Sequence, residues 1–360
     1  MTAGHPSLRT RLCDLVGVEW PIVQTGMGWV AYPPLVAATA DAGALGIVAS
    51  AMMSLDELAK AIAEVRAATA RPFGVNLRAD SPDAGDRIAL MAAEGVRVVS
   101  FAQAPKPELI AQAKGAGMVV LCSIGARRHA EKVAGWGADG VIVQGGEGGG
   151  HTGQVPTTLL LPQVVDAVGD RLAVIGAGGF FDGRGLVAAL AYGAQGIAMG
   201  TRFLLTRESP VAQAVKDVYL SKSVTDTVVT TQVDGVPHRV LRTALIEHLE
   251  RSGSVTALAR AARNALAFKR LSGAKWPDIV REGLAMRRSQ ELSLSQVVMA
   301  ANTPMLIKLA MVDGRPDLGV MASGQVVGVI DDLPSCAELV GRIVSEAVGV
   351  LTRLAGPEPR

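Results

Sequence analysis

The sequence is poor in the features that mark several large classes of protein. Only three of its 360 residues are cysteine, and Cys13, Cys122 and Cys336 stand far apart without a CxxC or Cys/His spacing. This excludes a disulfide framework and a zinc site, and it is typical of buried thiols in a reducing compartment. Aromatic residues make up only 4% of the chain. No apolar run approaches the roughly 18 residues that a membrane-spanning helix needs.

An excess of charge is also lacking. The formal net charge is +2, which gives no overall preference for nucleic acid or a membrane surface. Residues Met1 to Thr10 lack the basic-then-apolar pattern of a signal peptide, so we expect a cytoplasmic protein. A small-molecule substrate is expected from the motifs described below. The oligomeric state stays open, with a homo-oligomer among the alternatives. No GxGxxG follows an expected strand, so a Rossmann dinucleotide domain is not supported.

What the chain does have is a regular alternation of short apolar runs and helical patterns between Pro21 and about Thr206. The runs are Ile22–Gln24, Gly46–Ala49, Phe73–Asn76, Val96–Phe101, Met118–Cys122, Gly140–Val143, Leu172–Ile175 and Gly196–Met199. Eight β–α units predict parallel strands joined by crossover helices, and eight is the number that closes a (β/α)8 TIM barrel. An open doubly wound sheet is the alternative.

The segment from about Glu208 to Asn302 breaks this rhythm. It reads as mostly helical, with a hairpin over Thr227–Arg239 that turns at Asp234-Gly235. We therefore expect an α/β protein with three parts: a cofactor-binding barrel over residues 1–207, a helical lid or substrate domain over 208–302, and a return to the barrel over 303–360.

The expected lid carries a basic stretch. Between Arg251 and Gln290 there are nine Lys/Arg and two Asp/Glu, a local charge of 9 − 2 = +7. Such a stretch is usually a solvated helix face. Beside an active site it would instead hold an anionic substrate tail, such as the phosphates of coenzyme A.

Glycine and polar residues follow the expected strands at their C-terminal ends. They are Gln24-Thr-Gly-Met27, Asn76, Ser123, Gln144 to His151, Gly176-Ala-Gly-Gly179 and Gly200-Thr201. In a barrel, all of these meet at the face that holds the active site. The loops after strands seven and eight often bind phosphate through backbone N–H groups, which predicts a phosphate site at Gly178, Gly179, Gly200 and Thr201.

The loop after the sixth expected strand combines glycines with two titratable groups. Five of the six residues from Gly145 to Gly150 are glycine, the sixth is Glu147, and His151 follows. Because a histidine titrates near neutrality, His151 is the candidate for proton transfer, the alternative being a structural helix cap. We expect Glu147 to hold the loop through backbone N–H groups, with a direct role as the alternative.

Two amides complete the candidate site. Gln144 and Asn76 each offer a donor and an acceptor, as the pyrimidine edge of a flavin demands. The alternative for each is a solvated loop amide. No set of side chains with metal-ligand spacing accompanies them.

Six motifs together resemble the nitronate monooxygenase (2-nitropropane dioxygenase) family. They are Pro21–Met27, Gly43–Gly46, Phe73–Leu77, Gln144–Gly153, Gly176–Gly179 and Met199–Phe203. The resemblance implies a TIM barrel with tightly bound FMN. By resemblance, the residues around the cofactor would be Gly26 and Met27 against the isoalloxazine, Asn76 and Gln144 near its polar edge, Gly149 and Gly150 beside the catalytic His151, and Gly178, Gly179, Gly200 and Thr201 at the phosphate.

The family contains nitronate oxidisers, enoyl-thioester reductases and actinobacterial reductases of CoA thioesters in steroid-ring degradation. The chain is most similar to the last group, through Thr227–Arg242, Met299–Met305 and Ala322–Gln325. That resemblance implies an NADH-dependent reductase of an unsaturated bicyclic hydroxy-methyl-oxo-indene carboxyl-CoA thioester. The alternatives are a nitronate monooxygenase that uses O2 and a non-catalytic flavin-binding protein. Gln24–Met27 and Cys122-Ser123 depart from the nitronate oxidisers, which usually have an Ala-Pro-Met type turn and, in many cases, a lysine at these positions.

Overall fold

The computed structural model describes residues 5–233, 235–251 and 303–356, and these separate into two compact units. The barrel unit comprises Met1–Gly148, Gly153–Pro210 and Ile330–Arg360. The hairpin unit comprises Gly149–Thr152 and Val211–Val329. The chain passes from the first unit to the second and back within the glycine-rich loop. Each unit is described by itself.

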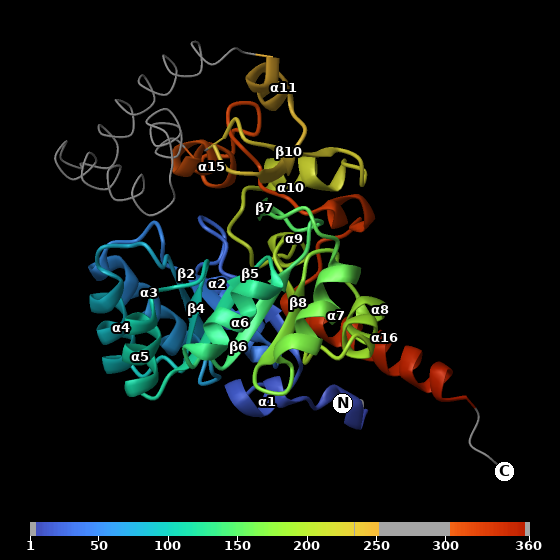
Figure 1. The fold of residues 1–360 in the computed structure, drawn as a ribbon. Coiled ribbons are helices and arrows are strands. Elements are labelled where there is room, and N and C mark those ends of the chain that lie inside the picture. Colours follow the sequence, from blue (N-terminus) through green and yellow to red (C-terminus); the bar gives the residue numbers. More distant parts are fainter. Residues whose placement is uncertain (1–4, 234, 252–302, 357–360) are drawn as a thin grey trace. The chain divides into compact units, whose positions relative to one another are not determined.

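The barrel unit is a closed barrel of eight parallel strands (Figure 1). The strands, in their order around the barrel, are β1 (Ile22–Gln24), β2 (Leu45–Ala49), β3 (Gly74–Leu77), β4 (Val98–Phe101), β5 (Val119–Ile124), β6 (Gly140–Gln144), β8 (Ala173–Ala177) and β9 (Ile197–Met199). The first and last strands pair in parallel, Ile22 opposite Ile197, and close the ring. The predicted TIM barrel is confirmed, with strand limits within two residues of the apolar runs in most cases.

The strands form because they are short, apolar and rich in β-branched residues. Every residue of β2 and β8 is buried, as expected for parallel strands that are covered on both faces. The helices outside them are α2 (Pro33–Asp41), α3 (Leu55–Ala68), α4 (Ala84–Ala93), α5 (Pro107–Gly115), α6 (Arg127–Gly135), α7 (Thr157–Val168) and α8 (Gly183–Ala191). Capping signals set their starts: Ser54 and Glu57 form a capping box at α3.

Two further helices complete the barrel unit. At the N-terminal end of the strands, α1 (Arg11–Val16), preceded by the short helix η1 (Pro6–Leu8), buries Leu12, Cys13 and Val16 against the barrel interior. At the C-terminal end of the chain, α16 (Cys336–Ala355) packs along α8. The turn after β9 continues as α9 (Thr201–Leu204).

The hairpin unit is built on a three-stranded sheet in the order β10–β11–β7, where β10 is Thr227–Thr230, β11 is His238–Leu241 and β7 is Gly150–His151. Both pairings are antiparallel. Its described residues form the helices α10 (Gln213–Leu220), α11 (Ala244–Arg251), α15 (Thr303–Met311) and the short η2 (Gln325–Val329). A small apolar core includes Val233, Val240, Ile246, Leu249 and Val320.

The predicted hairpin is present, but its connection is longer than a two-residue turn. Thr230 pairs with His238, so residues 231–237 join the strands. Gly235 takes a positive φ of 84° within this connection, while Asp234 lies outside the described residues. The basic stretch at 252–290 and the rest of the expected lid up to 302 also lie outside them, so the three-part domain division stays a prediction.

Among the described helices, none combines the length and the apolar character that a membrane crossing requires.

Candidate functional site

The C-terminal ends of β1 and β3 bring Gly26 and Asn76 together. A Cβ at position 26 would lie 2.5 Å from the Asn76 Cβ, so a glycine is needed there to admit the Asn76 side chain. Asn76 is held from both sides: its Nδ2 donates to Ser100 Oγ at 3.2 Å, and Ser50 Oγ donates to its backbone carbonyl at 2.7 Å. The Asn76 Oδ1 receives no hydrogen bond from a described residue, which leaves one acceptor at a strand end.

The loop after β1 also reaches the turn after β9. A Cβ at Gly200 would lie 3.4 Å from both Met27 Sδ and Thr25 Oγ1. Gly200 is the N-cap residue of α9, and Thr201 is the first residue of that helix and is buried. The structure therefore places Met27, Gly200 and Thr201 in one neighbourhood of the barrel unit.

Trp29 in the same loop is strained and has an unsatisfied donor. Within the described residues it is the single non-glycine with a positive φ, 65°. Its indole Nε1 is buried and donates to no described acceptor. Left-handed backbone at an aromatic residue costs on the order of 1–3 kcal/mol, and such strain gathers at functional sites. An acceptor on a bound ligand would satisfy this N–H.

The loops after β6 and β8 meet at Gly178 and Gly179. Both have left-handed backbone, with φ of 90° and 84°. A Cβ at Gly178 would lie 3.1 Å from the Gly145 carbonyl oxygen, whereas Gly179 has no neighbour closer than Glu147 Cβ at 3.9 Å. Within the described chain, neither glycine N–H donates to a protein acceptor. Two open backbone N–H groups after the seventh barrel strand match the predicted phosphate site.

Glu147 holds the glycine-rich loop, as predicted. Its carboxylate accepts from the Thr157 backbone N–H at 3.0 Å and from Thr157 Oγ1 at 2.7 Å, at the start of α7. Close packing also explains why position 148 of this loop is a glycine, because a Cβ there would lie 2.6 Å from Gln144 Nε2. The Gln144 side chain, at the end of β6, therefore lies directly beside Gly148.

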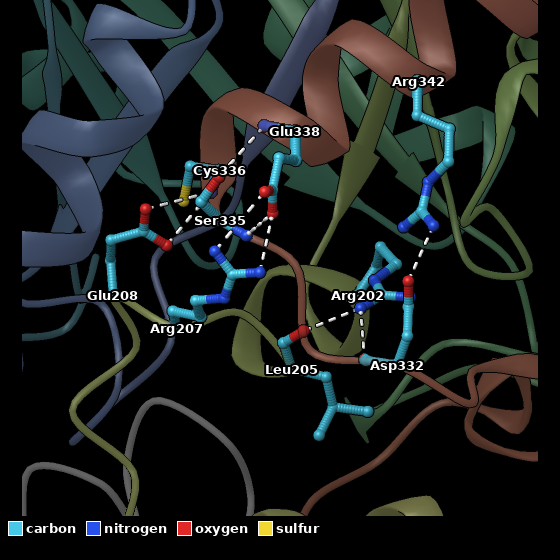
Figure 2. Close-up of polar contacts among 9 residues, drawn as sticks. All are labelled: Arg202, Leu205, Arg207, Glu208, Asp332, Ser335, Cys336, Glu338 and Arg342. Carbon is cyan, nitrogen blue, oxygen red and sulfur yellow. Dashed lines mark hydrogen bonds and ion pairs between the residues drawn. The ribbon is translucent and has the colours of Figure 1, made fainter.

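A buried arginine anchors the turn that carries Gly200 and Thr201 (Figure 2). Arg202 follows Thr201 and is 3% exposed. Its guanidinium donates to Asp332 Oδ1 at 2.9 Å and to the Leu205 carbonyl at 2.7 Å, and Arg342 of α16 donates to Asp332 Oδ2 at 2.6 Å. Burial acts to raise the pKa of Asp332, but the hydrogen bonds from Arg342 and Arg202 outweigh it and hold that pKa below its ordinary value.

The start of α16 is tied to the same turn (Figure 2). Glu208 accepts from the Cys336 backbone N–H at 3.0 Å, and Arg207 pairs with Glu338 at 3.1 Å. Ser335 and Glu338 form a capping box. A hollow of about 250 Å³ lies among these residues. Its arginines are already paired with its carboxylates, so it has an anchoring rather than a ligand-binding character.

The hairpin unit holds the remaining predicted residues, Gly149, Gly150 and His151. A Cβ at Gly149 would lie 2.5 Å from the Gly324 backbone nitrogen, so only glycine fits beside the 323–324 backbone. Gly150 and His151 form β7, in which His151 pairs with His238 of β11. His151 is exposed and His238 is 3% exposed. The predicted catalytic residue is therefore a strand residue with a fixed register, not a free loop residue.

These observations fit a flavin. The barrel unit offers open N–H groups for a phosphate at Gly178–Gly179, an amide acceptor at Asn76 and an orphaned donor at Trp29. These groups suit the binding of a planar ligand that forms hydrogen bonds. The one thiol among the barrel strands does not suit nucleophilic catalysis, because burial raises the pKa of Cys122 to about 12. Of the described residues, none forms a cluster able to hold a metal ion.

The sequence motifs did not point to Trp29, Arg202 or His238 as site residues. Trp29 gives no signal except its place after Met27. Arg202 lies in the motif Met199–Phe203, but its pairing with Asp332, 130 positions away, has no signal in the sequence. His238 lies in the motif Thr227–Arg242, which the resemblance covers. Its pairing with His151 could not be predicted, because the two-residue strand that carries His151 has no apolar run.

Comparisons with known proteins agree with this picture. The sequence model described as "Nitronate monooxygenase" matches residues 9–346. Proteins named (3aS,4S,5R,7aS)-5-hydroxy-7a-methyl-1-oxo-octahydro-1H-indene-4-carboxyl-CoA dehydrogenase are 63% identical in Mycobacterium tuberculosis and 60% identical in Rhodococcus jostii, each over 95% of this chain and 96% of theirs. The solved structure of FabK from Thermotoga maritima superposes with a TM-score of 0.77 at 34% identity, over 97% of this chain and 99% of that one.

Proposed function

Because this chain belongs to the nitronate monooxygenase family and is a flavin-dependent oxidoreductase, we propose that it binds FMN and oxidises or reduces a bicyclic indene-carboxyl CoA thioester. The observation that supports the substrate most strongly is the identity of 63% over 95% of the chain to the dehydrogenase named for such a thioester. The named reaction is the removal of two hydrogens. The sequence resemblance implied the reverse reaction, the reduction of an unsaturated thioester. One site serves oxidation and reduction, because the same bonds form and break in either direction.

We propose that four backbone or hydroxyl groups hold the FMN phosphate: Gly178, Gly179, Gly200 and Thr201. Gly26 and Met27 would lie against the ring, and Asn76 and Gln144 would face its polar edge. Support for this comes from the open N–H groups, the Asn76 acceptor and the glycine at 26 that admits Asn76. Gly150, which pairs with Arg239 in the sheet of the hairpin unit, and the preceding Gly149 would line the cofactor beside His151.

The chemistry follows from the thioester. A thioester carbonyl acidifies the neighbouring C–H bond, and a base with a pKa near neutrality is suited to remove that proton. We assign this proton to His151. The bound flavin supplies the two-electron acceptor or donor for the hydride on the adjacent carbon. NADH is proposed as the hydride donor to the flavin when the thioester is reduced, and in the oxidative direction the reduced flavin would pass the hydride to NAD+. The support for this redox partner is the family resemblance alone.

The basic stretch between Arg251 and Gln290 is the proposed site for the phosphates of coenzyme A. Its local charge of 9 − 2 = +7 contrasts with +2 − 7 = −5 for the rest of the chain. Guanidinium and ammonium groups bind phosphate oxygens with charge-assisted hydrogen bonds.

An anaerobic titration of the FMN holoenzyme tests the proposed function. The flavin absorbance is followed after addition of the saturated CoA thioester, NADH or an alkyl nitronate in separate cuvettes. We expect bleaching by the thioester and by NADH. Bleaching by the nitronate alone, with recovery on admitting O2, would identify the rival function, a nitronate monooxygenase, which the family description favours. A flavin that none of the three reduces would favour a binding protein.

A further inference from the structure

His238 is a second histidine placed against the proposed catalytic one. The two residues are direct partners in the antiparallel pairing of β11 with β7. Their ring centroids are 4.7 Å apart, and the planes are tilted by 46°. His238 is 3% exposed, whereas His151 is exposed. One imidazole is therefore part of the hairpin unit's packed interior, and the other lies on it and reaches solvent.

Several contacts fix this register. The Thr152 N–H donates to the Pro237 carbonyl at 3.1 Å, and Arg239 pairs with Gly150. Gly149 is packed against the 323–324 backbone at the other end of the short strand. A slip by one residue would turn the His151 side chain to the opposite face of the sheet. The pairing thus selects which side chain of the glycine-rich loop meets His238.

A histidine at the buried position 238 needs a physical reason. An aliphatic residue would fill a buried strand position without placing polar ring nitrogens in the interior, where they cost free energy unless satisfied. The planar ring at this position instead offers a flat surface to the His151 imidazole. Contact with a fixed ring restricts the rotamers of an exposed side chain, and a proton-transfer group loses rate steeply when it is misplaced by about 1 Å.

From this geometry we infer that His238 is a positioning residue for His151: its buried ring, locked by the β7–β11 register, holds the His151 imidazole in the orientation used for proton transfer. The inference rests on the proposed role of His151. It assigns no proton to His238 itself, which acts through the ring contact.

Three substitutions separate the ring from its polar atoms. His238→Phe keeps the flat ring, His238→Gln keeps polar atoms of similar reach, and His238→Ala removes both. His248→Ala, at an exposed histidine of α11, is the matched control within the same unit. We expect kcat for the thioester to fall on the order of tenfold in the Ala and Gln variants, with KM within about twofold. Phe should recover most of the loss, and the control should match wild type.

A second readout does not depend on turnover. The chain has five histidines, so the imidazole Cε1–H resonances of the flavin-free protein can be assigned by substitution. The His151 resonance should shift in His238→Ala and His238→Gln, because a ring 4.7 Å away no longer shields it, and should move less in His238→Phe. It should not move in His248→Ala.

The possible results are distinguishable. Wild-type turnover in His151→Ala would refute the proposed role of His151 itself. If His151→Ala loses turnover while His238→Ala keeps wild-type kcat and an unshifted His151 resonance, the positioning role is wrong. It is equally wrong if Phe is as impaired as Ala and Gln. In the His151→Ala background, adding His238→Ala should cause no further loss, and an additive loss would assign His238 a separate function.

Discussion

Trp29 carries two energetic costs at one position, a left-handed backbone and a buried indole N–H without an acceptor. A ligand acceptor would remove the second cost, which is roughly 1–3 kcal/mol. We therefore predict opposite effects of Trp29→Phe on two measurements. The flavin-free variant should be at least as stable to urea as flavin-free wild type, while its FMN affinity, measured by fluorescence quenching, should be weaker. Weaker stability with unchanged FMN affinity would show that Trp29 only fills space.

Asp332 links the buried Arg202 to α16, and its lowered pKa makes that link dependent on pH. The contribution of a carboxylate with a lowered folded-state pKa is complete above its unfolded value of about 3.9 and is lost as pH falls through the folded value. Because the Asp332 side chain is 37% exposed and solvent screens part of the pairing, Asp332→Asn should destabilise the protein by roughly 1 kcal/mol at neutral pH. In urea unfolding, the gap to wild type should stay constant from about pH 8 to 5 and shrink below about pH 4. A gap that is unchanged at pH 3 would contradict this.

Residue identity alone predicted some of these positions and not others. Asn76, Gln144 and the paired glycines follow apolar runs, so their place at strand ends could be read from the sequence. The strain at Trp29 and the pairing of Arg202 with Asp332 arise from tertiary packing. No local pattern encodes a contact across 130 positions.

At the scale of elements, glycines in α8 and α16 give a matched test of helix packing. Gly341, within α16, is exposed, and a Cβ there would meet no atom within 4 Å. Gly183, the first residue of α8, faces the α16 backbone, with Ala347 N 2.5 Å from its ideal Cβ. Alanine lowers the free energy of a helix interior by about 1 kcal/mol relative to glycine. Gly341→Ala should therefore raise the melting temperature.

Gly183→Ala should lower it, because backbone cannot move aside as a flexible side chain does. Thermal unfolding of both variants measures whether each melting temperature rises or falls relative to wild type. Equal effects of the two substitutions would mean that α8 and α16 do not pack as described.

The sequence patterns predict some of the strands and not others. The barrel strands are apolar and evenly spaced, so their number and order were predictable. β7 has only Gly150 and His151 and forms because β11 offers a free edge. The hairpin was predictable, but its connection, residues 231–237, is longer than a two-residue turn.

At the scale of the whole molecule, charge is unevenly distributed along the chain. If the stretch from Arg251 to Gln290, at +7, binds coenzyme A phosphates, salt should weaken that binding by screening. We predict that KM for the CoA thioester rises between low salt and about 0.5 M salt. KM for the matching pantetheine thioester, which lacks the nucleotide phosphates, should change little. Equal salt dependence of the two substrates would exclude phosphate recognition by this stretch.

We propose that a flavin held by the barrel unit exchanges hydride with a CoA thioester while His151 handles the proton. The most direct test is anaerobic single-turnover mixing of the FMN holoenzyme with the saturated indene-carboxyl CoA thioester, for wild type and His151→Ala. We predict rapid loss of oxidised-flavin absorbance in wild type. In the variant, the rate should be lower by about 10² or more with the flavin still bound. Equal rates in the two proteins, or a thioester that never alters the flavin spectrum, would contradict the account.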